Sequence, residues 1–140
     1  MKQILFFALI LAQTTIFSQN EAISGAYQLD FEASNGTYSE TLILQSDGSF
    51  NFHSYKKLEG MTPPETHAYG KGTWELKKNI VYFTANETDL DSKFTLNLNN
   101  TEARFSTKSP RDASNQEVPT MLTIFKSDEA GLVGRKLEKQ

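Results

Sequence analysis

The sequence predicts an all-β domain, in which about eight antiparallel strands follow one another in an up-and-down meander and close into a small barrel. Apolar and polar residues alternate through most of the chain after residue 20, and no stretch shows the spacing of an amphipathic helix. Short runs of Asn, Gly, Asp and Lys interrupt this alternation and mark turns. A meander with one apolar face and no covering helix must close or stack to bury that face. An open half-barrel or a two-sheet sandwich is the alternative, because closure depends on the last strands.

Length and composition restrict the class of protein. The 140 residues suffice for one domain, which we place at residues 19–140, and 10 Phe, 5 Tyr and 1 Trp are too many for a disordered tail. The absence of cysteine excludes disulfides, thiolate metal sites and thiol catalysis. The formal charge of −3 disfavours nucleic acid and anionic lipid as partners. We expect a monomer that does not insert into a membrane. The sequence does not identify a protein partner.

Residues 1–18 have the pattern of a secretory signal peptide. Lys2 precedes an unbroken apolar run over residues 4–12, and small polar residues follow it up to Ser18. The run is too short to cross a bilayer, since a spanning helix needs about 20 residues. We therefore expect export, with the mature protein in the periplasm or outside the cell.

The first two turns predict a strand register in which the apolar residues share one face. A two-residue turn at Asn35–Gly36 is a strong hairpin signal, and it pairs Tyr27 with Leu44. The next loop closes at Gly48, which we expect in the left-handed conformation of a β-bulge. That bulge pairs Leu44 with Phe50 and keeps both on the buried face.

Two further hairpins continue the same buried face. We expect Phe52 to lie opposite Trp74 across the third hairpin. A turn at Lys78–Asn79 then places Trp74 opposite Phe83, so that the single tryptophan lies between two phenylalanines.

The end of the chain is less regular. A turn at Asn99–Asn100 predicts a hairpin that pairs Leu96 with Ala103. The next strand, residues 120–126, has apolar residues on both faces, and a short ninth segment over residues 133–137 follows it. These last segments decide whether the barrel closes.

Three segments resemble a known family. They are Ser-Gly-Ala-Tyr-Gln-Leu at 24–29, Thr-Leu-Ile-Leu-Gln-Ser-Asp-Gly-Ser-Phe at 41–50 and Gly-Lys-Gly-Thr-Trp-Glu-Leu at 70–76. Together they resemble the small secreted lipocalin-like domains of bacteria, and they are also similar to the N-terminal barrel of copper-resistance envelope lipoproteins. The resemblance implies a calycin-type barrel that binds a ligand. Tyr27 stands where lipocalins carry tryptophan, and the lipoproteins' cysteine pair and lipid anchor are missing, so copper binding is not implied.

A ligand cup is the predicted site. In the expected topology the long connections 59–67, 86–92 and 108–118 lie at one end of the barrel, where inward-facing bulk decreases. Apolar walls with a few polar groups suit a small apolar molecule. The candidate ligand-binding residues are Phe31, Tyr38, Glu40, Ser54, Lys56, Gly72 and Ala85. The alternatives are that Glu40 and Lys56 merely reach solvent at the rim, and that the protein is a solid-core structural or protein-interaction module without a ligand.

Other motifs favour neither an enzyme nor a metal protein. No nucleophile elbow or paired base is visible, and we expect no enzymatic activity and no cofactor. In the predicted register His53 and His67 lie about 20 Å apart and are better explained as solvated side chains than as metal ligands. Glu87, Asp89 and Asp91 lack the pattern of a calcium loop and favour a solvated turn, although their role stays open.

Overall fold

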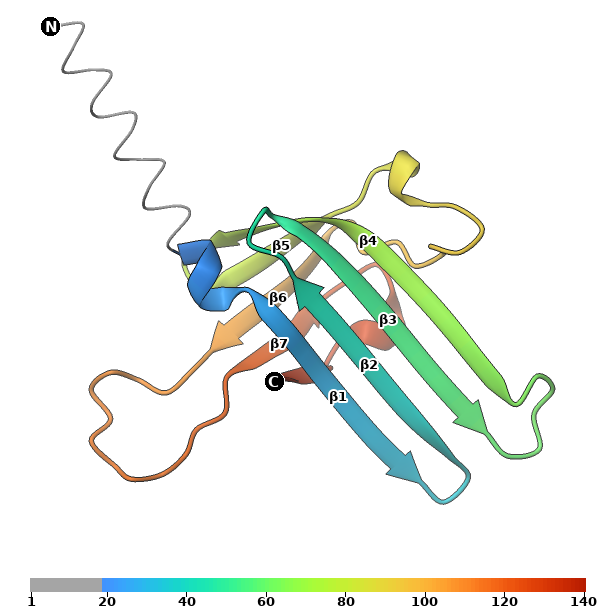
Figure 1. Ribbon diagram of the computed structural model, residues 1–140, viewed down its shortest axis with the longest axis horizontal. Coiled ribbons are helices and arrows are strands. Elements are labelled where there is room, and N and C mark those ends of the chain that lie inside the picture. Colours follow the sequence, from blue (N-terminus) through green and yellow to red (C-terminus); the bar gives the residue numbers. More distant parts are fainter. Residues whose placement is uncertain (1–18) are drawn as a thin grey trace, which may run out of the picture.

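The computed structural model describes residues 19–140, and the predicted signal peptide at residues 1–18 lies outside the described residues. Eight antiparallel strands form a closed barrel in chain order (Figure 1), which confirms the predicted fold class over the open half-barrel and the sandwich. β8 closes the barrel by pairing with both β7 and β1. The strands are β1 (Gly25–Ala33), β2 (Gly36–Leu44), β3 (Ser49–Leu58), β4 (Glu65–Lys77), β5 (Ile80–Thr84), β6 (Thr101–Ser106), β7 (Met121–Lys126) and β8 (Lys136–Lys139).

The predicted register of the first hairpin is wrong by two residues. Tyr27 pairs with Leu42 instead of Leu44, because the turn residues are Ser34–Asn35 and Gly36 already belongs to β2. Gly36 is needed inside the sheet, where an added Cβ would come within 2.1 Å of the carbonyl oxygen of Lys57. A shift of two residues leaves every side chain on its predicted face.

The predicted bulge between β2 and β3 is confirmed. Leu44 pairs with Phe50, and Gly48 has a φ of +90°. The Gly48 amide donates to the Gln45 carbonyl at 3.0 Å, and the Gly48 carbonyl accepts from the Trp74 amide at 2.8 Å. The bulge therefore joins the β2–β3 turn to β4.

We expect Gly48→Val to lower the free energy of unfolding by about 1–2 kcal/mol, because only glycine adopts a positive φ without strain. Space is not the cause, since the nearest atom to an added Cβ, the Trp74 carbonyl oxygen, is 3.7 Å away. Urea denaturation measures the loss, and Asn51→Val, at an exposed position of β3, is the control. An unchanged Gly48→Val midpoint would show that the strain has been overestimated.

The predicted register of β3 with β4 is wrong by four residues. Phe52 pairs with Gly70 rather than Trp74, whereas the predicted pair of Trp74 with Phe83 across the Lys78–Asn79 turn is confirmed. The long connection between β3 and β4 carries no register signal, so the error arose there. One consequence is that His53, expected about 20 Å from His67, lies within hydrogen-bonding distance of it.

The predicted pairing of Leu96 with Ala103 is also wrong, because residues 93–98 form no strand. Ala103 pairs with Val81 of β5, and the Leu96 amide donates instead to the Tyr69 carbonyl of β4 at 2.9 Å. Apolar alternation in this segment reflects the burial of Leu98 against the core, not sheet pairing. The predicted ninth segment, shifted toward the C-terminus, becomes the closing strand β8.

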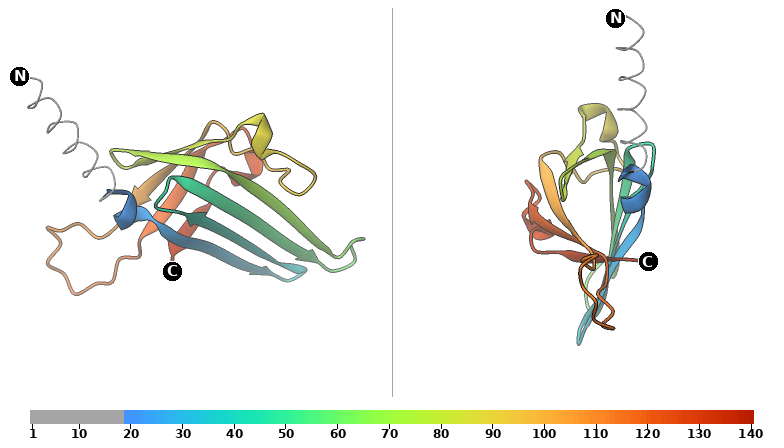
Figure 2. Two further views of the ribbon diagram at one scale, coloured as in Figure 1. Left: turned by 45° about the horizontal axis from the view of Figure 1, so that its top comes forward. Right: turned by 90° about the vertical axis from the view of Figure 1, so that its left-hand side faces the viewer.

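Because residues 93–98 form no strand, each later strand runs in the direction opposite to the one predicted. The connection of residues 107–120, expected with the other long loops, projects from the end that also carries the β2–β3 turn (Figure 2, left). The opposite end carries the β1–β2 turn, the β3–β4 connection and the segments of residues 85–100 and 127–135. We call this opposite end the mouth.

The barrel core between the mouth and the other end is a cluster of buried apolar side chains. Trp74, Phe83, Phe50 and Phe52 are buried there, and the Phe50 and Phe83 rings pack edge to face at 5.0 Å between centroids. Aliphatic side chains from every remaining strand complete the core. The described part of the chain, residues 19–140, contains no helix long and apolar enough to cross a membrane.

Candidate functional site

A hollow of about 200 Å³ lies at the mouth, beside the apolar core. One side is a row of residues paired across neighbouring strands, in which Glu40 of β2 pairs with Ser54 of β3 and Ser54 pairs with Ala68 of β4. The other side comes from the two connections that fold over the mouth. We call this hollow the mouth pocket; its lining residues are Glu40, Ser54, Ala68, Leu96, Glu129, Gly131, Leu132 and Arg135.

Backbone and side-chain hydrogen bonds hold the two connections in place. Leu96 is fixed by its bond to β4, and the neighbouring Asn97 amide donates to Glu129 Oε1 at 3.4 Å, which joins the two connections. The short 3₁₀ helix η2 (Ala130–Leu132) turns the chain, and Leu132 is buried against the core. Arg135 follows η2 and donates from Nε to the Gly131 carbonyl at 3.1 Å.

Glu40 is the buried charged group of the mouth pocket, with 7% of its surface exposed. Its Oε1 lies 3.5 Å from Arg135 Nε, while its buried Oε2 has no hydrogen-bond partner. Burial raises the pKa of the Glu40 carboxyl, and the positive charge of Arg135 offsets only part of this shift. An unpartnered buried carboxylate oxygen is costly, so this atom is poised to accept a hydrogen bond.

We expect Glu40→Gln to increase the free energy of unfolding at neutral pH. A carboxyl whose pKa is higher in the folded than in the unfolded state binds its proton more tightly when folded, so its charge destabilises the protein above that pKa. The gain from the neutral amide should shrink as the pH falls through the raised pKa of Glu40 towards its ordinary value. Urea denaturation across that range measures the difference, and Glu75→Gln, an exposed glutamate of β4, is the control. A gain that grows on acidification would contradict the assigned shift.

The predicted cup residues divide into those that line the mouth pocket and those that do not. Glu40 and Ser54 line it. Phe31, Tyr38 and Lys56 lie one row farther out, paired across β1, β2 and β3, on strands that extend past the point of closure (Figure 1). Phe31 is 56% exposed there.

The predicted pairing of opposite charges also differs from the structure. Lys56 Nζ lies 5.5 Å from the centroid of the Tyr38 ring, and the charge that faces Glu40 comes from Arg135. Sequence reasoning missed Arg135 and Glu129 because the β7–β8 connection has no strand alternation from which an inward direction can be inferred.

Gly72 and Ala85 lie deeper than predicted. Gly72 pairs with Phe50, which is a buried core residue. Ala85 directly follows β5 and is buried, and its amide donates to Asn99 Oδ1 at 3.3 Å. Neither residue lines the mouth pocket.

The acidic residues of the connection after β5 make local turns. Asp89 Oδ2 accepts from the Asn86 amide, and Asp91 Oδ1 accepts from the amides of Lys93 and Phe94, all at 2.8–2.9 Å. These bonds lower the pKa of Asp91. No group of three or more histidine, aspartate or glutamate residues within 19–140 is arranged to hold a metal ion.

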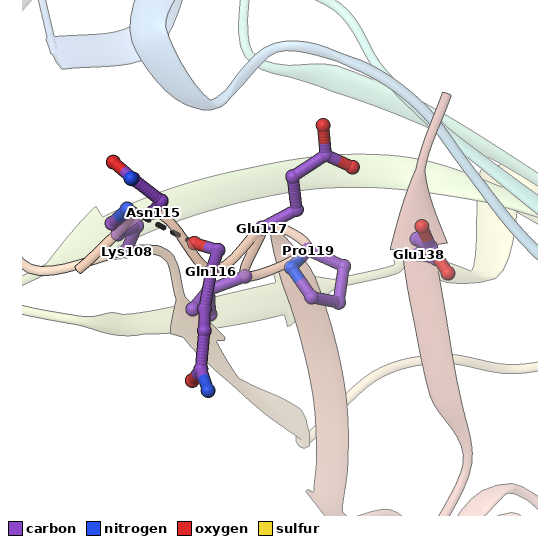
Figure 3. Close-up of a pocket in the computed structure, with 7 residues that line it drawn as sticks. Lys108, Asn115, Gln116, Glu117, Pro119 and Glu138 are labelled. Atoms are coloured by element: carbon purple, nitrogen blue, oxygen red, sulfur yellow. Dashed lines mark hydrogen bonds between the residues drawn. The ribbon is translucent and has the colours of Figure 1, made fainter.

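A larger hollow of about 560 Å³ lies at the other end, under the connection of residues 107–120 (Figure 3). Its lining is formed mostly by exposed side chains of that connection, with Glu138 of β8 opposite. Lys108 Nζ is occupied by the connection's own carbonyls, those of Ser114 at 2.5 Å and Gln116 at 2.9 Å. This hollow therefore offers no buried group that lacks a partner, and the mouth pocket is the better candidate site.

The chain matches no family model, no curated protein and no solved structure. Its closed, eight-stranded up-and-down meander is compatible with a lipocalin-like fold. The functional argument therefore depends on the geometry of the mouth pocket.

Proposed function

We propose that this protein is an exported, non-enzymatic barrel that binds a small ligand in the mouth pocket. The observation that carries the proposal is Glu40 Oε2, a buried carboxylate oxygen without a hydrogen-bond partner in a side chain that lines a hollow. A ligand that donates a hydrogen bond to this oxygen would relieve the cost of its burial.

The lining indicates the chemistry of the ligand. Ala68, Leu96 and Leu132 offer apolar contacts, and Ser54 and Arg135 add polar atoms at the edge. A hollow of about 200 Å³ suits a compact molecule. We infer a mainly apolar molecule with one N–H or O–H donor directed at Glu40.

A titration with 1-aminoanthracene tests the proposal, since this fluorophore combines an apolar body with an amine donor. We expect wild-type protein to bind it more tightly than anthracene, which lacks the donor. Glu40→Leu should remove most of this preference, about tenfold in affinity, because a hydrogen bond to a charged group contributes roughly 1.5–3 kcal/mol.

Two further variants make the test specific. Ala68→Phe places an aromatic ring in the pocket and should weaken binding of both probes, whereas Glu75→Gln, on the exposed face of β4, should change neither. Circular dichroism checks that each variant is folded. Equal binding by wild type and folded Ala68→Phe would exclude the mouth pocket, and the solid-core interaction module would then be the better hypothesis.

Export is supported by the pattern of residues 1–18. Mass spectrometry of the protein purified from its natural host should find a mature N-terminus close to residue 19. An intact Met1 on the mature protein would contradict export. Small molecules extracted from the same preparation should include a reproducible apolar passenger.

A further inference from the structure

We propose that His53 and His67 form a two-histidine site for a late first-row transition-metal dication such as Zn²⁺ or Ni²⁺, on the outer face of the barrel. The site is separate from the mouth pocket, because His53 and His67 project from the outer faces of β3 and β4 and line no part of it.

The strand register brings the two rings together. His53 pairs with Tyr69 and Tyr55 pairs with His67, so the histidines are diagonal neighbours on adjacent strands. His53 Nε2 and His67 Nδ1 are 2.9 Å apart, the ring planes differ by 5°, and the centroids are 5.2 Å apart. The rings thus meet edge to edge, with one nitrogen of each directed at the other.

This spacing matches the distance between two ligands of one ion. Imidazole nitrogens lie about 2.0–2.1 Å from zinc, so two of them at angles of about 90–110° are roughly 2.9–3.4 Å apart. Each ring would turn by roughly 45° to direct its lone pair to a shared ion, because the two nitrogens now point at each other along one line. Water would supply the remaining ligands, because His67 is exposed and the site is open to solvent.

The hydrogen bond between the two rings can rearrange so that both facing nitrogens are free to bind a metal ion. One of the two facing nitrogens now carries the shared hydrogen. On metal binding that ring would carry its hydrogen on the other nitrogen, so both facing nitrogens become ligands without a net change in protonation.

Groups beside the two histidines influence the affinity for a metal ion, and the lysine among them can be substituted to test the site. Lys93 lies near His53, with its Nζ 4.9 Å from the centroid of the Tyr69 ring, and its positive charge opposes a dication. The Tyr69 ring stacks on His53 at 4.6 Å between centroids, and the Tyr55 ring lies 5.0 Å from that of His67. These aromatic rings pack against the imidazoles without adding charge.

Isothermal titration of the untagged protein with Zn²⁺ tests the proposal. We expect one ion per chain, and His53→Asn or His67→Asn should each weaken binding about a hundredfold, because loss of either ligand removes chelation. Lys93→Gln should tighten binding about twofold to fivefold. Lys56→Gln, an exposed lysine on the inner face of β3, is the control and should leave binding unchanged.

Nuclear magnetic resonance distinguishes this site from adventitious binding. Zn²⁺ should shift the ring signals of both histidines together, while Mg²⁺, which prefers oxygen ligands, should shift neither. Zinc binding that survives in both histidine variants, or that depends on one histidine only, would overturn the proposal. Binding of 1-aminoanthracene in the mouth should be unaffected by either histidine variant, so this proposal and the proposed function fail independently.

Discussion

Trp74→Ala is expected to lower the free energy of unfolding by about 3–5 kcal/mol, the usual cost of removing a large aromatic side chain from a packed core. Trp74 is 5% exposed, pairs with Phe83, and donates from its indole Nε1 to the Gln45 carbonyl at 2.9 Å. Its backbone amide is also bonded to Gly48. Truncation would leave a cavity and remove one of the two hydrogen bonds that the Gln45 carbonyl accepts, at the point where the β2–β3 turn meets β4.

Urea denaturation followed by circular dichroism measures the loss. Trp74→Phe is the matched control, since it keeps an aromatic ring and removes the indole hydrogen bond, and we expect it to cost about 1–3 kcal/mol. Because Trp74 is the chain's single tryptophan, its emission in the wild type should also be blue-shifted and poorly quenched. Red-shifted, readily quenched emission would show that the indole is not buried.

Gly72→Leu is expected to prevent stable folding, with a loss of more than about 3 kcal/mol. A Cβ added at Gly72 would lie 2.2 Å from the Thr84 carbonyl oxygen and 3.0 Å from Phe50 Cε1. The first contact is with backbone, which can move only if β4 and β5 separate. The clash therefore cannot be relieved by a change of rotamer.

The matched control for Gly72→Leu is Gly131→Leu, on η2. An added Cβ at Gly131 meets no atom within 4 Å, so this variant should fold. Thermal unfolding compares the two, and a folded Gly72→Leu protein with wild-type stability would contradict the register of β4. The comparison also shows why the pocket must be filled from Ala68: a larger side chain at Gly72 disrupts the core before it reaches the mouth.

The sequence determined the fold class through local signals that do not depend on distant contacts. Alternation assigned most strands, and tight turns set the register at Gly48 and at Lys78–Asn79. At the first hairpin the turn signal placed the hairpin but missed its register by two residues. It also located two residues of the mouth pocket, Glu40 and Ser54, because inward-facing positions follow from parity alone.

Only the tertiary structure decided the features that depend on long connections. The β3–β4 connection carries no register signal, so the four-residue shift that joins His53 to His67 was not readable from local pattern. Residues 93–98 alternate like a strand, yet β6 pairs with β5 instead. Leu96 is then left to line the mouth pocket, while Lys93 and Phe94 lie against Tyr69 on the outer face of β4.

Glu40 likewise has one feature that the sequence predicts, its inward direction, and one that only the structure shows, its ion-pair partner. Its inward position follows from strand parity, but Arg135 reaches it from an irregular connection nearly a hundred residues later, so the ion pair and the unpartnered oxygen arise from closure of the barrel. Steric limits and turn residues let the local sequence specify the conformation of each strand and tight turn. A site formed by several connections is different, because the position of each connection depends on the packing free energy of the whole chain.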